Sequence, residues 1–278
     1  MKNRTLTLFV VLLGVIALVC GSNILITLNK AHTLLIKNRQ IHSSVHKASS
    51  IQREKFVDYI SGKDLHGWKQ LPLEPKTTRQ FELADPDNLG RTRDAHIQLT
   101  AKDLAKGKTA TSIALKPKGW HNYDFIDNTK PAEQAKKVRL MHKKNLIDYR
   151  LSTLNNDRRN LVALTAVADT GDVSSKNEDN QNCMRYYENH LISWLKSHAT
   201  TGDRLDLQVT PVYEGNDLVP HEIRLAYLGY DANNQPLEIC FNSPLEHVGQ
   251  HDATVVYIKN QSANADINYA NGTATYHS

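Results

Sequence analysis

The sequence predicts an α+β domain that follows an apolar N-terminal segment. In residues 95–100 and 204–213, apolar and polar side chains alternate, which is the pattern of a half-buried strand. From Tyr187 to Leu195, apolar side chains recur at i, i+4, i+7 and i+8, which is one face of a helix ending near Gly202. Strands and helices are mixed along the chain and do not strictly alternate, and this order favours an α+β fold.

Further strands are expected in the second half of the chain. The short apolar run 160–165 has the length and composition of a buried strand. Residues 222–230 and 237–242 are two strand-like segments separated by the turn sequence DANNQP, and together they predict a hairpin. The sequence contains no internal repeats and no glycine-rich phosphate loop.

The N-terminal segment has the length and composition of a transmembrane helix. No charged side chain occurs from Thr5 to Asn29, and roughly 20 apolar helical residues are enough to cross the hydrocarbon core. Lys2 and Arg4 precede the segment, as in a signal anchor or a signal peptide. No small-x-small cleavage site follows it cleanly, so we expect an uncleaved single-pass anchor in the cell membrane. A cleaved signal peptide, giving a secreted form, is the alternative.

Composition divides the chain into five parts, of which the largest is globular. The stalk that follows the anchor lacks glycine and proline over most of its length and is expected to be helical. The last part is rich in Asn, Ala, Ser and Thr, and is either a loose tail or a final edge strand. The expected parts are a cytoplasmic N-terminus at 1–4, the anchor at 5–28, the stalk at 29–66, the globular domain at 67–260 and the tail at 261–278.

Charge and cysteine content narrow the function only slightly. The formal net charge of +5 favours a polyanionic partner such as nucleic acid, or a cell-wall or membrane surface, but it is unremarkable for 278 residues. Cys183 and Cys240 lie in the globular part and are available to pair. No C-x-x-C sequence occurs, which argues against a structural zinc site.

Five segments of the globular part carry a family resemblance. They are LGRTRDAHIQLT at 89–100, KPKGW at 116–120, NLVALTA at 160–166, YYENHLISWL at 186–195 and RLDLQVTPVYEGNDLVPHEI at 204–223. In this order they resemble the DNA/RNA non-specific endonucleases, which include bacterial DNA-entry nucleases and streptococcal-type secreted DNases. The resemblance implies the ββα-metal (His-Me finger) nuclease fold with a central, mainly antiparallel sheet. It also implies an extracytoplasmic endonuclease that cleaves phosphodiester bonds of DNA or RNA.

The resemblance also implies a mechanism. In this family a histidine acts as general base on water, and one divalent ion stabilises the charge that develops on the phosphate. The base lies in a D-R-G-H motif followed by L-I/L-x-Y-x-L. The metal ligand is an asparagine after the N-I/L-x-x-x-T-A segment, and a glutamate of the Y-Y-E helix supports the site. The expected cofactor is Mg²⁺, or another divalent cation such as Mn²⁺, without an organic cofactor.

The general-base motif is altered in this chain. LIDYRL at 146–151 matches its second half, but the preceding residues are His142, Lys143, Lys144 and Asn145 in place of D-R-G-H. Asn145 therefore stands at the general-base position, where it has no titratable nitrogen. His142 is the nearest replacement, although on an extended strand it lies on the opposite face from Asn145. The chain is thus either an endonuclease with a relocated base or a degenerate nuclease fold that binds nucleic acid or another partner without efficient cleavage.

The remaining site positions follow from the resemblance. Asp169 falls at the position of the asparagine metal ligand, and Asn160 matches the other asparagine of that segment. Asp169 is equally consistent with a solvated turn, and Asn160 with a structural role in holding a loop. Glu188 matches the helix glutamate that supports catalysis. Basic residues around the motif are expected to bind nucleic-acid phosphates, namely Lys143, Lys144, Arg150, Arg158 and Arg159.

Overall fold

The computed structural model describes most of the globular part of the chain. The described residues are 76, 78–106, 112–126, 131, 133, 137–173, 176–249 and 252–277. They all belong to one compact unit, Lys55–Ser278, and Met1–Glu54 is the other unit. The predicted anchor at 5–28 and the predicted stalk at 29–66 lie outside the described residues. None of the described helices is long and apolar enough to cross a bilayer.

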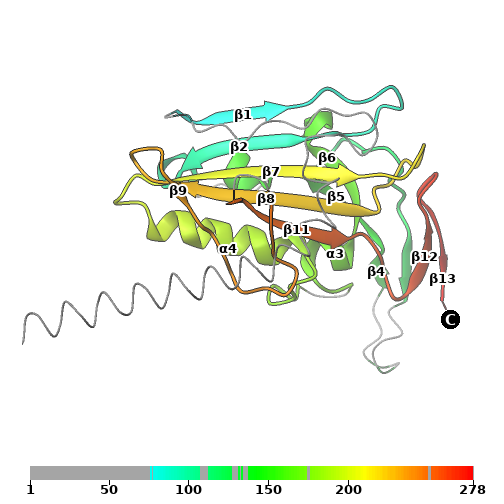
Figure 1. The fold of residues 1–278 in the computed structure, drawn as a ribbon. Helices are drawn as coiled ribbons and strands as arrows, with labels where there is room; N and C mark the ends of the chain where they lie inside the picture. Colours follow the sequence, from blue (N-terminus) through cyan, green and yellow to red (C-terminus); the bar gives the residue numbers. More distant parts are fainter. Residues whose placement is uncertain are drawn as a thin grey trace, which may run out of the picture. The chain divides into compact units, whose positions relative to one another are not determined.

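An antiparallel sheet forms the centre of this unit (Figure 1). Among the described residues it has seven strands, in the order β1-β2-β7-β8-β11-β10, and β9 pairs with the end of β8. Its pairings are all antiparallel, which confirms the predicted α+β fold with a mainly antiparallel sheet. The strands are β1 (Gln80–Leu83), β2 (Ala95–Thr100), β7 (Arg204–Val212), β8 (Glu222–Tyr230), β9 (Pro236–Leu237), β10 (His247–Val248) and β11 (Thr254–Lys259).

The hairpin predicted for residues 222–242 is much shorter than expected. Strand β8 forms, but β9 has only two residues, and it pairs only with Gly229 and Tyr230. The rest of this edge of β8 is already taken, because β11 pairs with β8 from Glu222 to Tyr227. Beyond β9 the backbone turns away from the sheet, and the N–H groups of Phe241 and Ser243 donate to the Glu246 carboxylate.

One face of the sheet is covered by the segments that carry the altered motif. Strands β5 (Met141–Asn145) and β6 (Leu161–Thr165) form a separate antiparallel pair, and helix α3 (Ala166–Thr170) follows β6 directly. Helix α4 (Met184–Ser197) buries Tyr187, Leu191 and Leu195 in the main apolar core. The short elements between β5 and β6 are α2 (Tyr149–Ser152) and η3 (Arg158–Asn160), and η1 (Ala101–Asp103) follows β2.

Helix α3 is short because its two ends are fixed by local chemistry. The Thr165 hydroxyl accepts a hydrogen bond from the Ala168 N–H and caps the N-terminus. Gly171 ends the helix with φ of 85°, in the left-handed region, and a Cβ atom at this position would collide with the Asn177 carbonyl oxygen. The turn holds Asp169, the next-to-last residue of the helix, against β5.

The segment set apart as a tail in the sequence contains a β-hairpin. Strands β12 (Ala265–Asn268) and β13 (Thr273–Tyr276) pair with each other in a two-stranded sheet. Their apolar side chains join a second core cluster with Leu140, Met141 and Ala163. Another small pair, β3 (Asp124–Ile126) and β4 (Lys137–Arg139), flanks this cluster. Cys183 and Cys240 are both free thiols, the first buried and the second exposed.

Candidate active site

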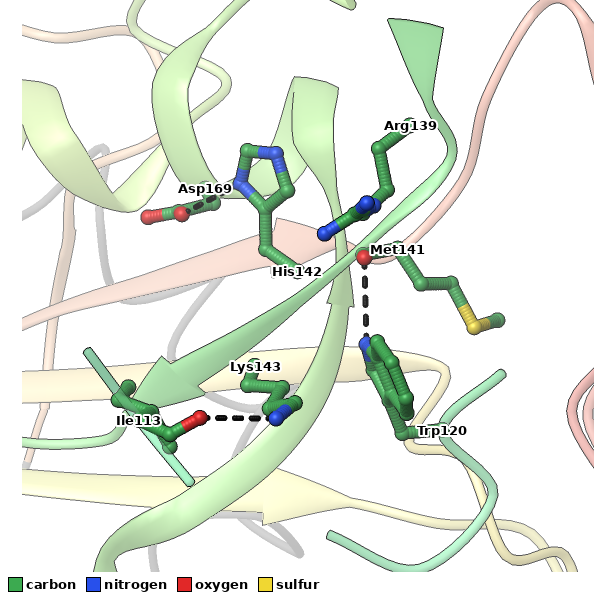
Figure 2. Close-up of a pocket in the computed structure, with 7 residues that line it drawn as sticks. All are labelled: Ile113, Trp120, Arg139, Met141, His142, Lys143 and Asp169. Carbon is green, nitrogen blue, oxygen red and sulfur yellow. Dashed lines mark hydrogen bonds and ion pairs between the residues drawn. The ribbon is translucent and has the colours of Figure 1, made fainter. Parts of the chain in front are cut away.

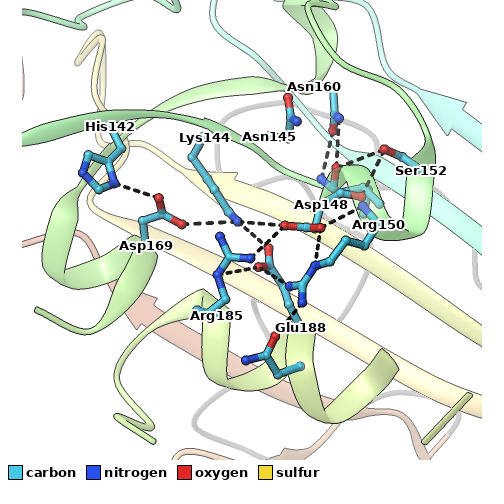
Figure 3. A network of polar contacts seen from close by, with 12 residues as sticks. His142, Lys144, Asn145, Asp148, Arg150, Ser152, Asn160, Asp169, Arg185 and Glu188 are labelled. Atoms are coloured by element: carbon cyan, nitrogen blue, oxygen red, sulfur yellow. Dashed lines mark hydrogen bonds and ion pairs between the residues drawn. The ribbon is translucent and has the colours of Figure 1, made fainter. Parts of the chain in front are cut away.

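Strand β5 sends alternate side chains to opposite sides, and this separates the four residues of the altered motif. His142 and Lys144 lie on the side that faces α3, where both contact Asp169 (Figure 3). The His142 Nδ1 atom is 2.8 Å from Asp169 Oδ2, and the Lys144 Nζ atom is 3.3 Å from Asp169 Oδ1. One carboxylate therefore holds both side chains, each through a different oxygen.

An open pocket lies next to this strand (Figure 2). It has a volume of about 310 Å³, and its lining residues are Ile113, Trp120, Arg139, Met141, His142, Lys143 and Asp169. The Lys143 Nζ atom lies 4.9 Å from the centre of the Trp120 ring and donates to the Ile113 carbonyl oxygen at 2.8 Å. Arg139 contacts Asp124 at 3.2 Å on its other side. The pocket thus combines a histidine, two cations and a large aromatic ring.

Behind the pocket lies a buried ion-pair cluster, defined here as Lys144, Asp148, Arg150, Asp169, Arg185 and Glu188 (Figure 3). At its centre, the Lys144 Nζ atom is 2.6 Å from Glu188 Oε1, 3.3 Å from Asp169 Oδ1 and 3.7 Å from Asp148 Oδ2. These carboxylates come from α4, α3 and the N-cap of α2. Lys144 is 5% exposed, so its ammonium group is enclosed by protein.

Two arginines complete the cluster. Arg150 Nε lies 2.9 Å from Asp148 Oδ1, and Arg150 NH2 lies 3.7 Å from Glu188 Oε2. Arg185 reaches the same two carboxylates at 3.4 and 3.9 Å. The cluster therefore sets three cations against three carboxyl groups, with no surplus of negative charge to attract a further cation.

The electrostatics of the cluster follow from burial and from these contacts. Burial by itself lowers the pKa of Lys144, but Glu188, Asp169 and Asp148 outweigh burial and hold that pKa above its ordinary value. Burial opposes ionisation of Asp148 and Asp169 as well, yet Lys144, together with Arg150 at Asp148 and with His142 at Asp169, keeps the pKa of both below the ordinary range. Burial raises the pKa of Glu188 to about 7, against the pull of Lys144.

The divalent ion implied by the resemblance does not fit these residues. Magnesium takes oxygen ligands at about 2.0–2.1 Å in near-octahedral geometry. Asp169 already uses one oxygen for His142 and the other for Lys144, and Glu188 Oε1 contacts Lys144. Among the described residues, no group of three or more His, Cys, Asp or Glu side chains is arranged to hold a metal ion. The carboxylates that such an ion would need are in contact with the Lys144 ammonium.

The other expected site residues lie apart from the pocket. Asn145 is buried on the opposite side of β5 and donates to Asn155 Oδ1 at 3.1 Å. Asn160 is fully buried, and its side-chain amide accepts from the N–H of Ile147 and donates to the carbonyl oxygen of the same residue. Both groups of the Asn160 amide therefore hold the loop that follows β5.

The predicted phosphate-binding residues divide in the same way. Lys143 lines the pocket, whereas Lys144 is buried among carboxylates and cannot reach a phosphate. Arg150 belongs to the ion-pair cluster, and Arg159 pairs with Asp157 at 2.8 Å. Arg158 is exposed on η3. The burial of Lys144 could not be predicted from its strand alone, because it depends on the carboxylates of the helices that pack against that strand.

Sequence reasoning missed three residues of this region. Asp148 lies within the LIDYRL segment, four residues after Lys144, and Arg185 lies three residues before Glu188 on α4. The spacing of Arg185 and Glu188 was a usable signal, since side chains three apart on a helix are neighbours. The same rule does not reach Asp148, because Lys144 lies on strand β5. Arg139 carried no comparable signal, because it stands outside the segments that resemble the family, although it lies only three residues before His142.

Comparison with proteins of known structure shows which family the chain belongs to. No protein-family model matches the sequence, and a search of curated proteins finds no match. Among solved structures, the chain is similar to an extracellular nuclease at 33% identity, with a TM-score of 0.59, over 75% of this chain and 98% of that chain. It is similar to an extracellular endonuclease at 35% identity, with a TM-score of 0.60, over 74% and 90% of the two chains.

A more distant structure has the same fold. NucA from Streptococcus agalactiae, solved with a magnesium ion bound, is 21% identical and covers 75% of this chain and 83% of its own length, with a TM-score of 0.51. The five motifs, the antiparallel sheet and the identity to the two extracellular enzymes agree with one another. The chain belongs to the DNA/RNA non-specific endonuclease family, as the resemblance of its motifs implies.

Proposed function

We propose that this protein is an extracellular nuclease that hydrolyses phosphodiester bonds with His142 as the general base. The observation that carries this proposal is the 2.8 Å contact between His142 Nδ1 and Asp169 Oδ2 at the edge of the pocket. A carboxylate only accepts hydrogen bonds, so Nδ1 carries a proton, and in the neutral form of this imidazole the lone pair lies on Nε2. Asp169 thus acts as the positioning residue for a neutral imidazole that can accept a proton.

The proposed reaction needs no step beyond hydrolysis. His142 Nε2 takes a proton from a water molecule as the water oxygen forms a bond to phosphorus. The bond from phosphorus to the leaving oxygen breaks, and the leaving oxygen takes a proton from solvent. Lys143 and Arg139 line the same pocket and would stabilise the negative charge that builds up on the phosphate.

Nucleic acid is the substrate class that this pocket suits. Lys143 and Arg139 offer cationic groups to a phosphate, and the Trp120 ring offers a flat apolar surface beside them. Phosphate contacts carry no base sequence, so cleavage would be non-specific. We include the exposed Arg158 as an outlying phosphate contact and assign Asn160 a structural role. DNA and RNA are both candidate substrates because nothing in the proposed contacts depends on the 2′-hydroxyl.

The direct test is cleavage by purified protein of supercoiled plasmid and of single-stranded RNA. His142→Ala should abolish most cleavage, whereas Asn145→His should change little, because Asn145 lies on the other side of β5. His277→Ala is the matched control, since His277 makes a histidine–aspartate pair with Asp266, also at 2.8 Å, on the exposed β13 side. Cleavage that survives in His142→Ala would exclude His142 as the base.

Binding without cleavage is the second candidate function. It is favoured by Asn145, which cannot act as a base at the position where the family has its histidine. In that case the wild-type protein would bind DNA at low salt and leave it intact, and Asn145→His would not by itself restore cleavage. Wild-type protein without nicking activity but with salt-sensitive binding would establish this candidate over the first.

We further propose that residues 5–28 anchor the protein in the cell membrane with the nuclease domain outside. This rests on the uncharged segment from Thr5 to Asn29 and on the extracellular placement of the similar nucleases. Protease treatment of intact cells should remove the domain from the cell-associated fraction. A domain that is degraded only after lysis would contradict the proposed orientation.

A further inference from the structure

We infer that the Lys144 ammonium group is a built-in cation that takes the place of a divalent metal ion among Asp148, Asp169 and Glu188. The three carboxylates come from the N-cap of α2 and from helices α3 and α4, and they converge on one Nζ atom, at 3.7, 3.3 and 2.6 Å. Lys144 is 5% exposed, so neither solvent nor a phosphate competes for this group. This inference goes beyond the proposed function and does not depend on it.

The charge balance of the cluster explains why no further cation is needed. Lys144, Arg150 and Arg185 together match the three carboxyl groups. A divalent ion added to this balanced set would meet an ammonium group within a few ångströms, and the two would repel each other. Removal of the Lys144 side chain would leave a negative surplus and open a space bounded by three carboxylates.

A fixed ammonium also changes what Asp169 can do. An ammonium ion donates hydrogen bonds but has no open coordination positions for water, so it cannot generate a metal-bound hydroxide. Because Lys144 contacts only Oδ1 of Asp169, Oδ2 remains on His142. The built-in cation therefore neutralises Asp169 without taking away its contact to the histidine. The protein should neither need nor bind a divalent ion here.

The test is a comparison of metal binding by wild-type protein and by Lys144→Gly. Glycine removes the whole side chain, and it is also the residue of the D-R-G-H motif at this position. Mn²⁺ binding is followed by electron paramagnetic resonance, and the melting temperature is recorded with Mg²⁺, with Mn²⁺ and with EDTA. Wild-type protein should bind no Mn²⁺, and its melting temperature should not respond to any of these. Lys144→Gly should bind about one Mn²⁺, and the ion should raise its melting temperature because it binds only the folded state.

Lys143→Gly is the matched control. It makes the same change one residue earlier on the same strand, but its ammonium contacts the Ile113 carbonyl oxygen and not the carboxylates. It should remain insensitive to Mn²⁺. In Lys144→Gly/Glu188→Gln, loss of one carboxylate should weaken Mn²⁺ binding at least tenfold.

Folding of the variant does not limit the test. If Lys144→Gly is unfolded without metal, Mn²⁺ should restore its folding, as judged by circular dichroism. Failure of Mn²⁺ to bind or refold Lys144→Gly would overturn the inference. So would Mn²⁺ binding by the wild-type protein that is lost in Asp169→Ala. None of these readouts uses cleavage, so they are independent of whether His142 is the base.

Discussion

Two of the polar networks buried in the described part of the chain are built in different ways. In the central sheet, His96 and Gln98 of β2 both donate to the Asp206 carboxylate of the neighbouring strand β7. The sheet network joins residues of adjacent strands, and none of its three residues lines the pocket. The ion-pair cluster around Lys144 joins β5 to α2, α3 and α4, and it shares Asp169 with the pocket.

The difference shows what each network can do. A carboxylate that bonds only within one sheet, such as Asp206, stabilises the pairing of its strands. Removal of its partners should therefore lower the stability of the fold. A carboxylate held between several elements positions those elements relative to one another, and Asp169 in addition positions a histidine at a pocket. Four experiments test this difference between the two networks.

The largest effect is expected at His142. His142→Ala removes the proposed general base, so cleavage of supercoiled plasmid should fall by about 10²–10⁴-fold with little change in stability. The corresponding change in the sheet network, His96→Ala, should leave the cleavage rate of the folded protein near wild type. It should lower the free energy of unfolding by about 1–3 kcal/mol, because it leaves Asp206 short of a donor. Equal losses of cleavage in both variants would remove the distinction between the networks.

Lys144→Ala should cause the largest loss of stability. It leaves three buried carboxyl groups without their shared cation, and breaking a buried ion pair in this way costs about 3–5 kcal/mol. Asp206→Ala removes the charge itself from the sheet network and should cost less, about 1–3 kcal/mol. Urea denaturation of both variants at neutral pH measures the two costs. A smaller loss in Lys144→Ala than in Asp206→Ala would contradict the central role given to Lys144.

The pH dependence of stability should carry the signature of Glu188. Its pKa in the folded protein is about 7, above the ordinary 4.5, so the folded state holds the proton more tightly than the unfolded state. This contribution to stability is present below about pH 4.5 and is lost as the pH rises to about 7. Relative to Glu188→Gln, the wild-type protein should lose about 3 kcal/mol across this range.

The aspartates of the cluster should act in the opposite direction. The pKa values of Asp148 and Asp169 lie below the ordinary range, so their stabilisation is present above about pH 4 and is lost as the pH falls further. Urea denaturation between pH 3 and pH 8, in steps, separates the two effects. A wild-type curve parallel to that of Glu188→Gln from pH 4.5 to pH 7 would show that Glu188 titrates normally.

The smallest effect is expected for nucleic-acid binding through Lys143. Lys143→Ala should weaken DNA binding about equally for all sequences and reduce the slope of log K against log salt by about one. Lys196→Ala, on the exposed side of α4, is the control and should leave the slope unchanged. The slope is read from binding titrations at several salt concentrations. An unchanged slope in Lys143→Ala would move the phosphate contact away from the pocket.

The sequence predicted those features that depend on local pattern. Strand β2 has the predicted bounds, and α4 contains the predicted helical face. The alternation in β2 predicted a strand but not its burial, because the polar side chains of His96 and Gln98 are buried as well. The placement of His142 and Asn145 on opposite sides of β5 also followed from strand geometry alone. The shortness of β9 could not be predicted from the local sequence. The strand that takes its place beside β8 is β11, which comes later in the chain.

The charge pattern around the motif was harder to interpret from sequence. Lys143 and Lys144 are adjacent and chemically identical, yet one lines the pocket and the other is buried. What separates them is the set of carboxylates that α3 and α4 bring to one side of β5. Those contacts join residues more than 20 positions apart, so no local pattern near Lys144 could reveal them.

The C-terminal hairpin of β12 and β13 supports the pocket, although the ribosome makes it after the strands that line the pocket. Ala265 packs with Leu140 and Met141 in the second core cluster, and the carbonyl oxygen of Tyr269 accepts from the N–H groups of Leu218 and Val219. These residues are synthesised after the other described elements, although they support the strand that carries His142. The nascent chain therefore contains every proposed catalytic residue before it contains the hairpin that supports them. A chain cut short just after β11 would keep its reactive groups and lose the apolar support for their alignment.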